Sequence, residues 1–323
     1  MTLPPALARG LDTVLDRAVV PGYTSIGPAV RRRLGTWPAD PAPAALAQRT
    51  ALVTGASSGL GIAAAEGLAR LGATVRLVVR DPAKGERARA EILRAVPGAD
   101  VTVERCDVGD LDDVRRFVAD NGELSGDAAV DVLVHNAGVM PPERTESAQG
   151  HELSMAVHVL GPVLMSELLA PRMSETRVVF VTSGGMYAQR LRTDDLGYHD
   201  GDYSPTTAYA RSKRAQVELL PVLAQRWGAQ RTFVAAMHPG WAATPGVTES
   251  LPTFDKLLGP VLRDPAEGID TAVWLAARTP TPESGLLWHD RRARPTSLLP
   301  HTRPSTAQRQ ELWDWVRRVT QLP

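Results

Sequence analysis

The stretch Thr50-Ala51-Leu52-Val53-Thr54-Gly55-Ala56-Ser57-Ser58-Gly59-Leu60-Gly61 decides the fold that we expect for this chain. Its first four residues form a short apolar run, which predicts a buried strand, and the alanine-rich segment Ile62–Arg70 predicts a helix. The glycines between them therefore occupy a strand-to-helix turn. That is the context that a dinucleotide-binding fingerprint requires.

The glycines of this turn suit a phosphate-binding loop. Gly55 allows a tight turn, because glycine adopts backbone angles that a side chain forbids. Gly59 and Gly61 let the backbone approach a pyrophosphate and let the helix pack close to the sheet. The helix N-terminus then offers free N–H groups and a partial positive charge. An ordinary turn that binds no ligand is the alternative interpretation, and motifs elsewhere in the chain are needed to choose between the two.

Composition narrows the class of protein. The 323 residues carry 36 Lys and Arg against 36 Asp and Glu, so the net charge is zero and nothing indicates a nucleic-acid partner. The single cysteine, Cys106, excludes an internal disulfide and fits a reducing compartment. The N-terminus lacks a basic leader, and the most apolar window, Met155–Ala170, is too short and polar for an integral membrane segment. We expect a soluble, cytoplasmic protein.

Residues 1–49 precede the fold proper and are expected to form a helical extension. In Ala6–Val19, apolar residues recur at helical spacing, which predicts a helix packed on the domain's own surface. A membrane-surface helix or a dimer-forming helix is the alternative. Arg31–Arg33 is expected to be a solvated run, and the proline-rich segment Trp37–Pro43 a linker. The apolar positions of the predicted helix are Leu7, Leu11, Val14, Leu15 and Ala18.

From Thr50 onward, strands and helices alternate through one predicted domain, residues 50–323. Short apolar strands separated by helices predict a Rossmann-type α/β fold, a doubly wound parallel sheet with helices on both faces and ligands at the carboxyl ends of the strands. The expected seven strands or so are 50–53, 74–79, 101–105, 130–135, 178–183, 232–237 and 285–289. The expected helices are 62–70, 83–96, 111–121, 147–169, 209–227, 265–278 and 305–320.

A tyrosine–lysine pair carries the strongest chemical signal. Tyr209 and Lys213 are four apart on a predicted helix, so their side chains share one face. A nearby ammonium and a nicotinamide cation would lower the pKa of the phenol, which could then exchange a proton with a carbonyl or alcohol oxygen. Ser183 ends the preceding strand and could hold that oxygen against the phenol.

The glycine loop, the strand-end serine and the Tyr-x-x-x-Lys pair, in this order, resemble the short-chain dehydrogenase/reductase (SDR) superfamily. The resemblance implies an oxidoreductase with Ser183, Tyr209 and Lys213 as catalytic residues, the last two also touching cofactor. His135 replaces the first asparagine that usually precedes the superfamily's Asn-Ala-Gly turn. The other implied cofactor-binding residues are Thr54, Gly55, Ser57, Ser58, Gly59, Leu60 and Gly61 in the loop, Asp107 and Val108 beside the adenine, Asn136, Ala137 and Gly138, and Pro239, Gly240 and Thr244 at the nicotinamide.

Within the superfamily, three segments resemble the branch of dehydrogenase/reductase SDR family member 12: residues 181–186, 209–213 and 237–247. That resemblance runs from about Gly22 to Pro300 and implies a lipid-derived substrate. It also implies homo-oligomers that pair the helices 147–169 and 209–227, although Pro221 is expected to bend the second helix.

One family residue is absent. The fourth catalytic position, usually asparagine, is His158. Pro162 lacks an N–H and cannot bond the carbonyl four residues back, which is that of His158. We therefore hypothesise that this free carbonyl holds a relay water, so that His158 serves catalysis through its backbone. A kinked helix with a packed histidine is the alternative.

The residues at the end of the second predicted strand indicate whether the chain binds NAD or NADP. Relatives that use NAD carry an acid at the last strand position, which is Val79 in this chain. Arg80 follows, placed to meet the 2′-phosphate of NADP. Asp81 is the competing candidate for the ribose, but we expect it to cap the next helix. NADP is therefore expected, and NAD is the alternative.

These observations predict an NADP(H)-dependent enzyme that interconverts a carbonyl and an alcohol on an apolar small molecule. A lid is expected around residues 245–264, where Leu251, Phe254, Leu257 and Leu258 recur at helical spacing. The alternatives are a non-catalytic NADP-binding sensor and an epimerase or dehydratase.

The seven histidines show no metal-ligand spacing, so no metal is expected. Met140, Met186, Tyr187 and Trp241 are expected near the substrate, and Arg291, Arg292 and Arg294 on the surface.

Overall fold

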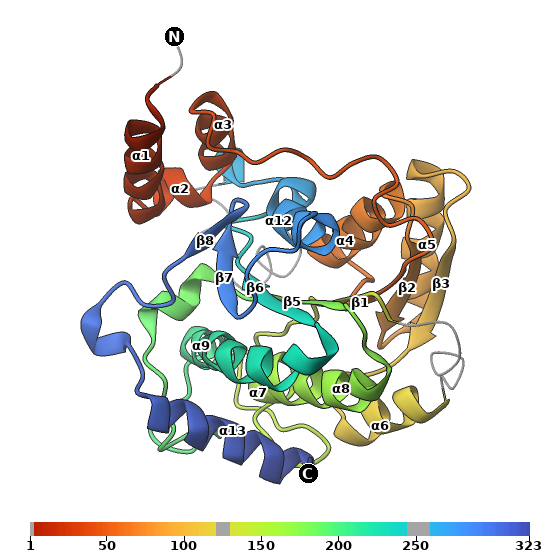
Figure 1. The fold of residues 1–323 in the computed structure, drawn as a ribbon. Coiled ribbons are helices and arrows are strands. Elements are labelled where there is room, and N and C mark those ends of the chain that lie inside the picture. Colours follow the sequence, from red (N-terminus) through yellow and green to blue (C-terminus); the bar gives the residue numbers. More distant parts are fainter. Residues whose placement is uncertain (1–2, 121–129, 244–258) are drawn as a thin grey trace.

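The computed structural model describes residues 3–120, 130–243 and 259–323. Its centre is one eight-stranded sheet in the order β3-β2-β1-β4-β5-β6-β7-β8, in which only β8 is antiparallel to its neighbour. Figure 1 shows the sheet running through the middle of the molecule. The strands are β1 (Thr50–Thr54), β2 (Thr74–Val79), β3 (Val101–Arg105), β4 (Val132–His135), β5 (Arg177–Val181), β6 (Phe233–Met237), β7 (Leu286–His289) and β8 (Arg292–Arg294).

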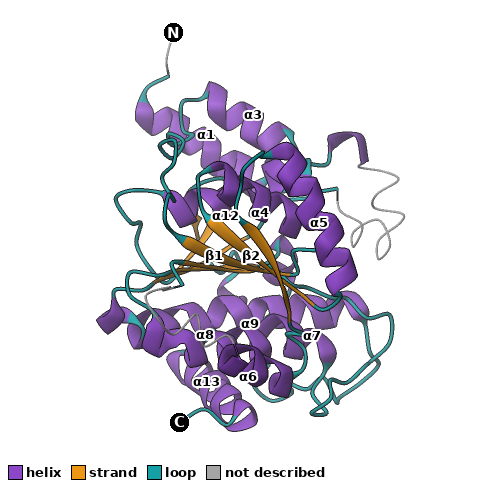
Figure 2. Ribbon diagram, turned by 90° about the vertical axis from the view of Figure 1, so that its right-hand side faces the viewer, coloured by secondary structure: helices purple, strands orange, loops and turns teal. Residues whose placement is uncertain are grey.

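Helices cover both faces of the sheet, as Figure 2 shows edge-on. The predicted doubly wound α/β fold is therefore confirmed, with β8 as a strand that the sequence did not predict. One layer holds α4 (Gly59–Arg70), α5 (Pro82–Ala95) and α12 (Pro265–Ala277). The other holds α6 (Leu111–Asp120), α7 (Leu153–Met155), α8 (Gly161–Leu169), α9 (Pro205–Arg226) and α13 (Thr306–Thr320).

The strands alternate their side chains between two cores. In β1, Leu52 faces the core beneath α8 and α9, whereas Ala51 and Val53 face the core beneath α4 and α12. This period of two lets every buried strand supply both layers, because successive side chains point to opposite faces of the sheet. The parallel strands thereby end at one common edge.

The predicted long helix 147–169 begins only at Leu153. Gly150 has a φ of +76°, which ends any regular helix there, and the Glu152 carboxylate caps the helix that follows. A π-helical turn, Ala156–Leu160, then interrupts the α-helix. A Cβ on Gly161 would collide with the Val108 carbonyl, so this glycine lets the helix approach the loop after β3.

Leu153–Arg172 is, within the described ranges, the one helical segment long and apolar enough to cross a membrane, and 78% of that stretch is buried in the protein. It packs between the sheet and α6, so its apolar character is that of a core helix.

The N-terminal extension folds as α1 (Pro5–Arg17), α2 (Val20–Tyr23) and α3 (Ile26–Arg33), which pack beside β7 and β8 (Figure 1). Two expectations for this region are wrong. Arg31 is not solvated but 1% exposed, and Leu7, Leu11, Val14 and Ala18 do not pack on the domain. The helix α1 packs instead through Ala8, Asp12 and Asp16.

Buried ion pairs explain this reversal. Asp12 binds Arg31 at 2.7 Å and Arg294 at 2.9 Å, and Asp290 binds Arg263 at 2.6 Å and also Arg31. Arg294 is therefore buried, and so is Arg291, which pairs with Asp270 at 2.6 Å, whereas we expected both arginines on the surface. Partners more than 250 residues apart in the chain hold the extension to β7 and β8.

Candidate active site

Ser183, Tyr209 and Lys213 meet at the carboxyl edge of β5. The Ser183 hydroxyl hydrogen-bonds the Tyr209 phenol. Lys213 Nζ donates to the Val181 carbonyl at 2.8 Å, and the Thr182 hydroxyl donates to the Lys213 carbonyl at 3.1 Å. These bonds fix α9 against the end of β5, so the structure brings the three predicted catalytic side chains together.

Burial sets the protonation of this group. It raises the pKa of Tyr209, and the hydrogen bond from Ser183 opposes that rise. The expected lowering is therefore not found in the protein by itself. Lys213 does not supply it, because burial also lowers the pKa of its ammonium to about 7. At neutral pH, Tyr209 is thus a protonated phenol that can donate a proton.

His158 is a fully buried residue with every polar atom bonded. Its carbonyl accepts a 2.7 Å hydrogen bond from the Gln216 amide, so the hypothesis of a free carbonyl that holds a relay water is wrong. Its Nε2 accepts from the Val139 N–H at 3.0 Å, and its Nδ1 lies 2.8 Å from the Ser212 hydroxyl. Ser212 donates onward to the Tyr209 carbonyl, so Nδ1 carries the histidine proton.

Burial lowers the pKa of His158 far below its usual range, with a smaller contribution from Lys213. The ring lies edge-on to Tyr209, with ring centroids 5.2 Å apart. His158 thus ties the turn after β4 to the helix that carries Tyr209. We describe it as a positioning residue.

The glycine loop is tight for steric reasons. Gly55 has a φ of +66°, and a Cβ at that position would lie 2.7 Å from the Ala137 Cα. A Cβ on Gly61 would collide with the Gly55 carbonyl. Only hydrogen fits at both positions, which lets the loop after β1 approach the loop after β4.

Thr54 and Asn136 join those two loops. The buried Thr54 hydroxyl accepts from the backbone N–H groups of Asn136 and Ala137, each at 3.1 Å. The Asn136 amide donates back to the carbonyls of Thr54 at 3.1 Å and Gly55 at 3.3 Å. Both side chains are used within the protein, so they shape the loop instead of pointing out of it.

The N-terminus of α4 fits a phosphate. The preceding residue, Ser58, is extended and exposed, and its side chain does not cap the helix. The neighbouring α5, by contrast, is capped by Asp81, which accepts from Ala83 and Lys84 as expected. The first N–H groups of α4 therefore lack a side-chain partner at a helix end that favours negative charge.

The remaining predicted cofactor residues lie along the same edge. Arg80 is exposed directly after β2, and Asp107 after β3 accepts from the Gly109 N–H at 2.9 Å. Val108 is buried in the core, whereas Gly138 after β4 is exposed. Ser57 and Leu60 are half-buried in the glycine loop. Because every one follows a strand at its carboxyl end, they lie along one edge of the sheet, the edge at which ligands bind in folds of this kind.

The segment after β6 turns at Gly240, whose φ is +73°. A Cβ at Gly240 would lie 2.5 Å from the Tyr23 carbonyl and 2.6 Å from Arg263 Nε. Pro239 and Gly240 are thus placed between the sheet and the extension. Thr244 and residues 245–258 of the expected lid lie outside the described residues, and 259–264 form a short 3₁₀ turn and the approach to α12.

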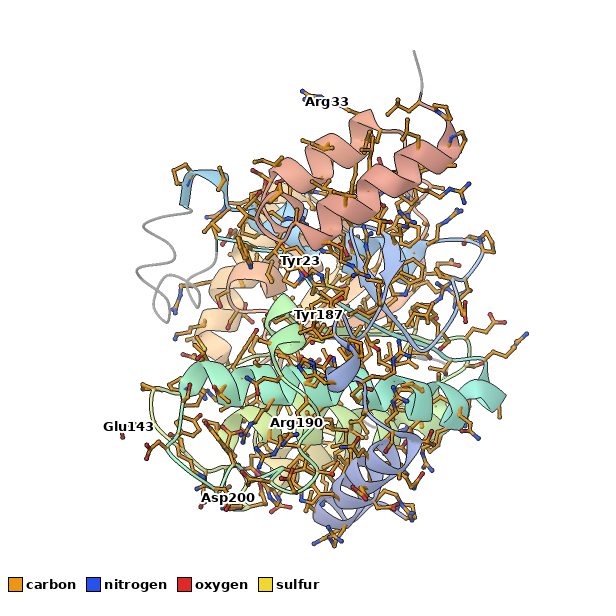
Figure 3. All side chains as sticks on the ribbon, turned by 90° about the vertical axis from the view of Figure 1, so that its left-hand side faces the viewer. Tyr23, Arg33, Glu143, Tyr187, Arg190 and Asp200 are labelled. Atoms are coloured by element: carbon orange, nitrogen blue, oxygen red, sulfur yellow. The ribbon has the colours of Figure 1, made fainter. Side chains whose placement is uncertain are left out.

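Tyr23 is a site residue that we did not predict. It is 4% exposed, its carbonyl accepts from the Trp241 N–H at 2.7 Å, and its ring lies 4.7 Å from that of His238. The ring also contacts Gly184, next to Ser183. Figure 3 shows Tyr23 beneath the N-terminal helices and above Tyr187. No motif marks this residue; the single hint is that the family resemblance begins at about Gly22.

Met186 and Tyr187, which we expected near the substrate, contact other parts of the protein in the structure. Met186 is 0% exposed, with its sulfur 3.5 Å from Arg214, so it belongs to the core. Tyr187 is half-buried, and its hydroxyl donates to the Pro295 carbonyl at 2.8 Å. Met140 is half-buried after β4, and Trp241 lies against Tyr23, so both keep a place near the site.

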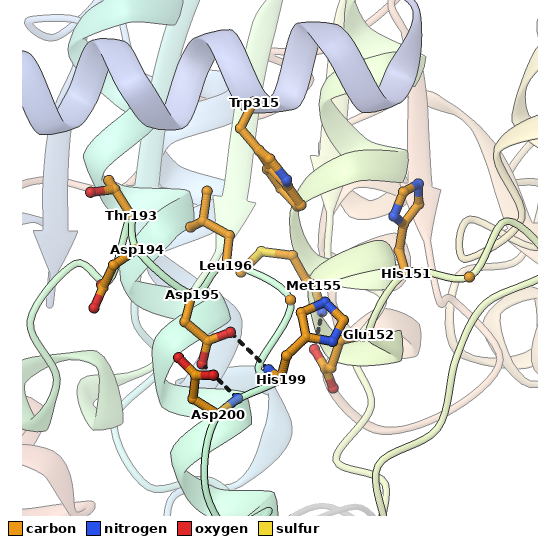
Figure 4. Close-up of a pocket in the computed structure, with 12 residues that line it drawn as sticks. His151, Glu152, Met155, Thr193, Asp194, Asp195, Leu196, His199, Asp200 and Trp315 are labelled. Atoms are coloured by element: carbon orange, nitrogen blue, oxygen red, sulfur yellow. Dashed lines mark hydrogen bonds between the residues drawn. The ribbon is translucent and has the colours of Figure 1, made fainter.

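A separate hollow of about 330 Å³ lies between residues 150–155, the loop 193–200 and Trp315 of α13 (Figure 4). It contains none of the predicted site residues, and its lining includes His151, Glu152, Asp195, His199 and Trp315. Its carboxylates serve the fold, because Glu152 and Asp195 accept from nearby backbone N–H groups. We assign no catalysis to it.

Comparisons with known proteins agree with this geometry. The sequence model of the short chain dehydrogenase family matches residues 49–194. Dehydrogenase/reductase SDR family member 12 of Bos taurus is 37% identical over 273 residues, which are 82% of this chain and 84% of that protein. Retinol dehydrogenase 12 of Bos taurus is 33% identical, again over 82% of this chain and 84% of the relative.

A solved short chain dehydrogenase from Escherichia coli CFT073, described as complexed with NADPH, has a TM-score of 0.64 and 25% sequence identity. The alignment covers 78% of this chain and all of that one. The chain therefore belongs to the short-chain dehydrogenase/reductase superfamily of oxidoreductases. Within it, the chain falls in the branch of the SDR family member 12 proteins, as the sequence resemblance predicted.

Proposed function

We propose that the protein is an NADP(H)-dependent reductase of apolar carbonyl compounds that also runs as an alcohol dehydrogenase in reverse. The observation that carries the proposal is that Ser183, Tyr209 and Lys213 meet at the end of β5, at the same carboxyl edge of the sheet as the uncapped N-terminus of α4 after β1. A proton donor, a hydrogen-bond donor and a phosphate-binding helix end then share one crevice. An intact catalytic group of this kind favours an enzyme over a non-catalytic sensor.

A nicotinamide cofactor bound along the crevice would supply the hydride that adds to the carbonyl carbon. This chain's own residues handle the oxygen. The Ser183 hydroxyl would orient it by donating a hydrogen bond, and the Tyr209 phenol would give it a proton as the C=O bond becomes C–OH. Lys213 would stabilise the phenolate that remains only while its amine carries a proton, until solvent returns the proton to Tyr209.

The preference for NADP rests on three residues at the end of β2. Val79 is buried and offers no carboxylate to a ribose, and the Asp81 carboxylate is occupied as a helix cap. Arg80 is exposed beside them, where a guanidinium can pair with a 2′-phosphate. The E. coli structure described as complexed with NADPH supports the same choice.

Replacing Arg80 tests this preference. We expect Arg80→Ala to weaken NADPH binding by at least about tenfold, the equivalent of a lost charge-assisted pair, and to leave NADH binding nearly unchanged. Arg94→Ala, at the exposed last turn of α5, is the matched control and should alter neither affinity. An equal loss for both cofactors, or no loss for NADPH, would refute the preference.

An apolar substrate is favoured by the relatives. Retinol dehydrogenase 12 is named for an apolar alcohol, and in this chain Met140 follows β4 and Trp241 packs against Tyr23 after β6, so both apolar side chains follow strands at the carboxyl edge of the sheet. The test is turnover of NADPH with a panel of aldehydes and ketones of increasing chain length. We expect kcat/KM to rise with apolar size, whereas a preference for small polar carbonyls would contradict the proposed substrate class.

A further inference from the structure

The helix α1 is amphipathic, but its charged face is buried and its apolar face is exposed. Its inward face carries Asp12 and Asp16, which are 1% and 5% exposed. Its outward face carries Leu7, Leu11 and Val14, which are 51%, 42% and 66% exposed. A surface helix normally buries its leucines and exposes its carboxylates. The outward apolar stripe therefore has no partner within the described part of the chain.

The stripe belongs to a larger surface. Among the described residues, eight large apolar side chains are exposed, and all but Leu299 lie in the N-terminal extension. We call these the apolar face: Leu3, Leu7, Leu11, Val14, Val19, Val20 and Ile26. Clustered exposure of this kind marks an interaction surface, whereas single exposed leucines need no explanation.

The exposed charged side chains that the extension places around the apolar face are positive. Residues 3–39 contain two carboxylates, Asp12 and Asp16, and both are buried against Arg31 and Arg294. Two exposed arginines flank the face, Arg17 in the last turn of α1 and Arg33 at the end of α3. Within residues 3–39, the surface is thus apolar with a cationic border and exposes no carboxylate.

The orientation of α1 is fixed by its inward ion pairs. Turning the helix to bury Leu7 and Leu11 would carry Asp12 out to solvent. Arg31 and Arg294 would then remain buried without their counter-ion, which is strongly unfavourable. The outward direction of the leucines is therefore a property of the folded protein.

We propose that this face docks the protein on the surface of an anionic lipid bilayer. Apolar side chains bordered by arginine are the pattern of a helix that lies in the membrane interface. A second copy of the chain fits the face less well. Two-fold pairing would place Arg17 and Arg33 of both copies in one interface, where residues 3–39 offer no exposed carboxylate to neutralise them.

Docking in this way would bring the lipid close to the crevice. The helix α2 leads from Val20, on the apolar face, directly to Tyr23, which contacts Gly184 next to Ser183. The docking itself does not depend on the proposed function. If the substrate is apolar, as proposed above, the membrane would also be the place where it is found.

Vesicle co-sedimentation of the full chain tests the proposal. We expect binding to phosphatidylcholine vesicles that contain phosphatidylserine, and much weaker binding without that lipid or at high salt. The variant Leu7→Ser/Leu11→Ser/Val14→Ser should lose at least about tenfold in binding. Leu299→Ser removes an equally exposed apolar side chain elsewhere and should bind as the wild type does.

A second variant, Arg17→Glu/Arg33→Glu, changes only exposed side chains and should abolish the preference for phosphatidylserine. Unchanged thermal unfolding will show that both variants fold. Wild-type protein that ignores phosphatidylserine vesicles, or a triple serine variant that binds them equally well, would overturn the proposal. A wild-type dimer that the triple variant converts to monomer would overturn it as well, and would assign the face to a second copy.

Discussion

The ring of Tyr23 lies directly against Gly184, the residue that follows Ser183. A Cβ built on Gly184 would be 2.6 Å from Tyr23 Cε2, closer than any side chain tolerates. The N-terminal extension and the loop that carries the strand-end serine are therefore packed against each other, and the extension forms one wall beside the catalytic group.

This contact predicts the effect of a single methyl group. Gly184→Ala should push Tyr23 away, destabilise the protein by about 1–3 kcal/mol and lower kcat, because Ser183 moves with its neighbour. Urea unfolding and turnover of an apolar aldehyde measure the two effects. Gly185→Ala is the control, since its new Cβ would meet only the Ser183 hydroxyl at 3.5 Å. Equal behaviour of the two variants would show that the packing against Tyr23 does not matter.

His158 should act through position and not through a proton. His158→Ala leaves the Val139 N–H without an acceptor, at a cost of about 1–3 kcal/mol, and removes the hydrogen bond that the Ser212 hydroxyl accepts. We expect unfolding at lower urea and reduced kcat. His158→Asn, which again offers a donor and an acceptor, should restore part of both.

The pH profile of kcat distinguishes a positioning role of His158 from a role in proton transfer. Since burial holds the pKa of His158 far below its usual range, the ring stays neutral and contributes no titration near pH 6–7. The profile of kcat should therefore keep its shape in His158→Asn. A limb of the profile that disappears with the histidine would mean that its side chain transfers a proton.

Lys213 should make stability depend on pH. Its pKa is about 7 in the folded protein, far below the 10.5 that is ordinary for lysine, because burial disfavours the ammonium. Between these values the unfolded chain binds the proton and the folded chain does not, so the free energy of unfolding rises with pH. From pH 7 to 9, the wild type should gain on the order of 2 kcal/mol relative to Lys213→Met.

Urea unfolding at a series of pH values measures this gain, and Lys84→Met serves as the control because Lys84 is exposed. The control should follow the wild type throughout. Parallel curves for the wild type and Lys213→Met would show that the buried amine keeps an ordinary pKa. Burial raises the pKa of Cys106 to about 12, so that thiol titrates in this range only in the unfolded chain; it is shared by all three proteins and cancels in the comparison.

The sheet could be predicted from the sequence because its signals are local. The strands β2 and β3 have the predicted bounds, since each is rich in valine and threonine and lies close to glycine, proline or aspartate. The glycine loop and the Tyr209–Lys213 pair are also local patterns. Short patterns at strand ends meet in space because parallel strands share one carboxyl edge.

The extension could not be predicted, because its structure depends on distant partners. A run such as Arg31–Arg33 is normally solvated, and Arg31 is buried only because Asp12 and Asp290 surround it. The face that α1 presents to the protein is set by the same ion pairs and not by its leucines. Helical spacing identified the helix but assigned the wrong face to the interior.

Tyr209→Phe tests the central claim most directly. The variant lacks only the phenol oxygen, so NADPH binding measured by fluorescence should remain within about twofold of the wild type. Turnover of the best aldehyde in the panel should fall by about 10²–10⁴-fold, the usual contribution of a positioned proton donor. Retained binding with lost turnover is the predicted result. Turnover at the wild-type rate in Tyr209→Phe would contradict the account.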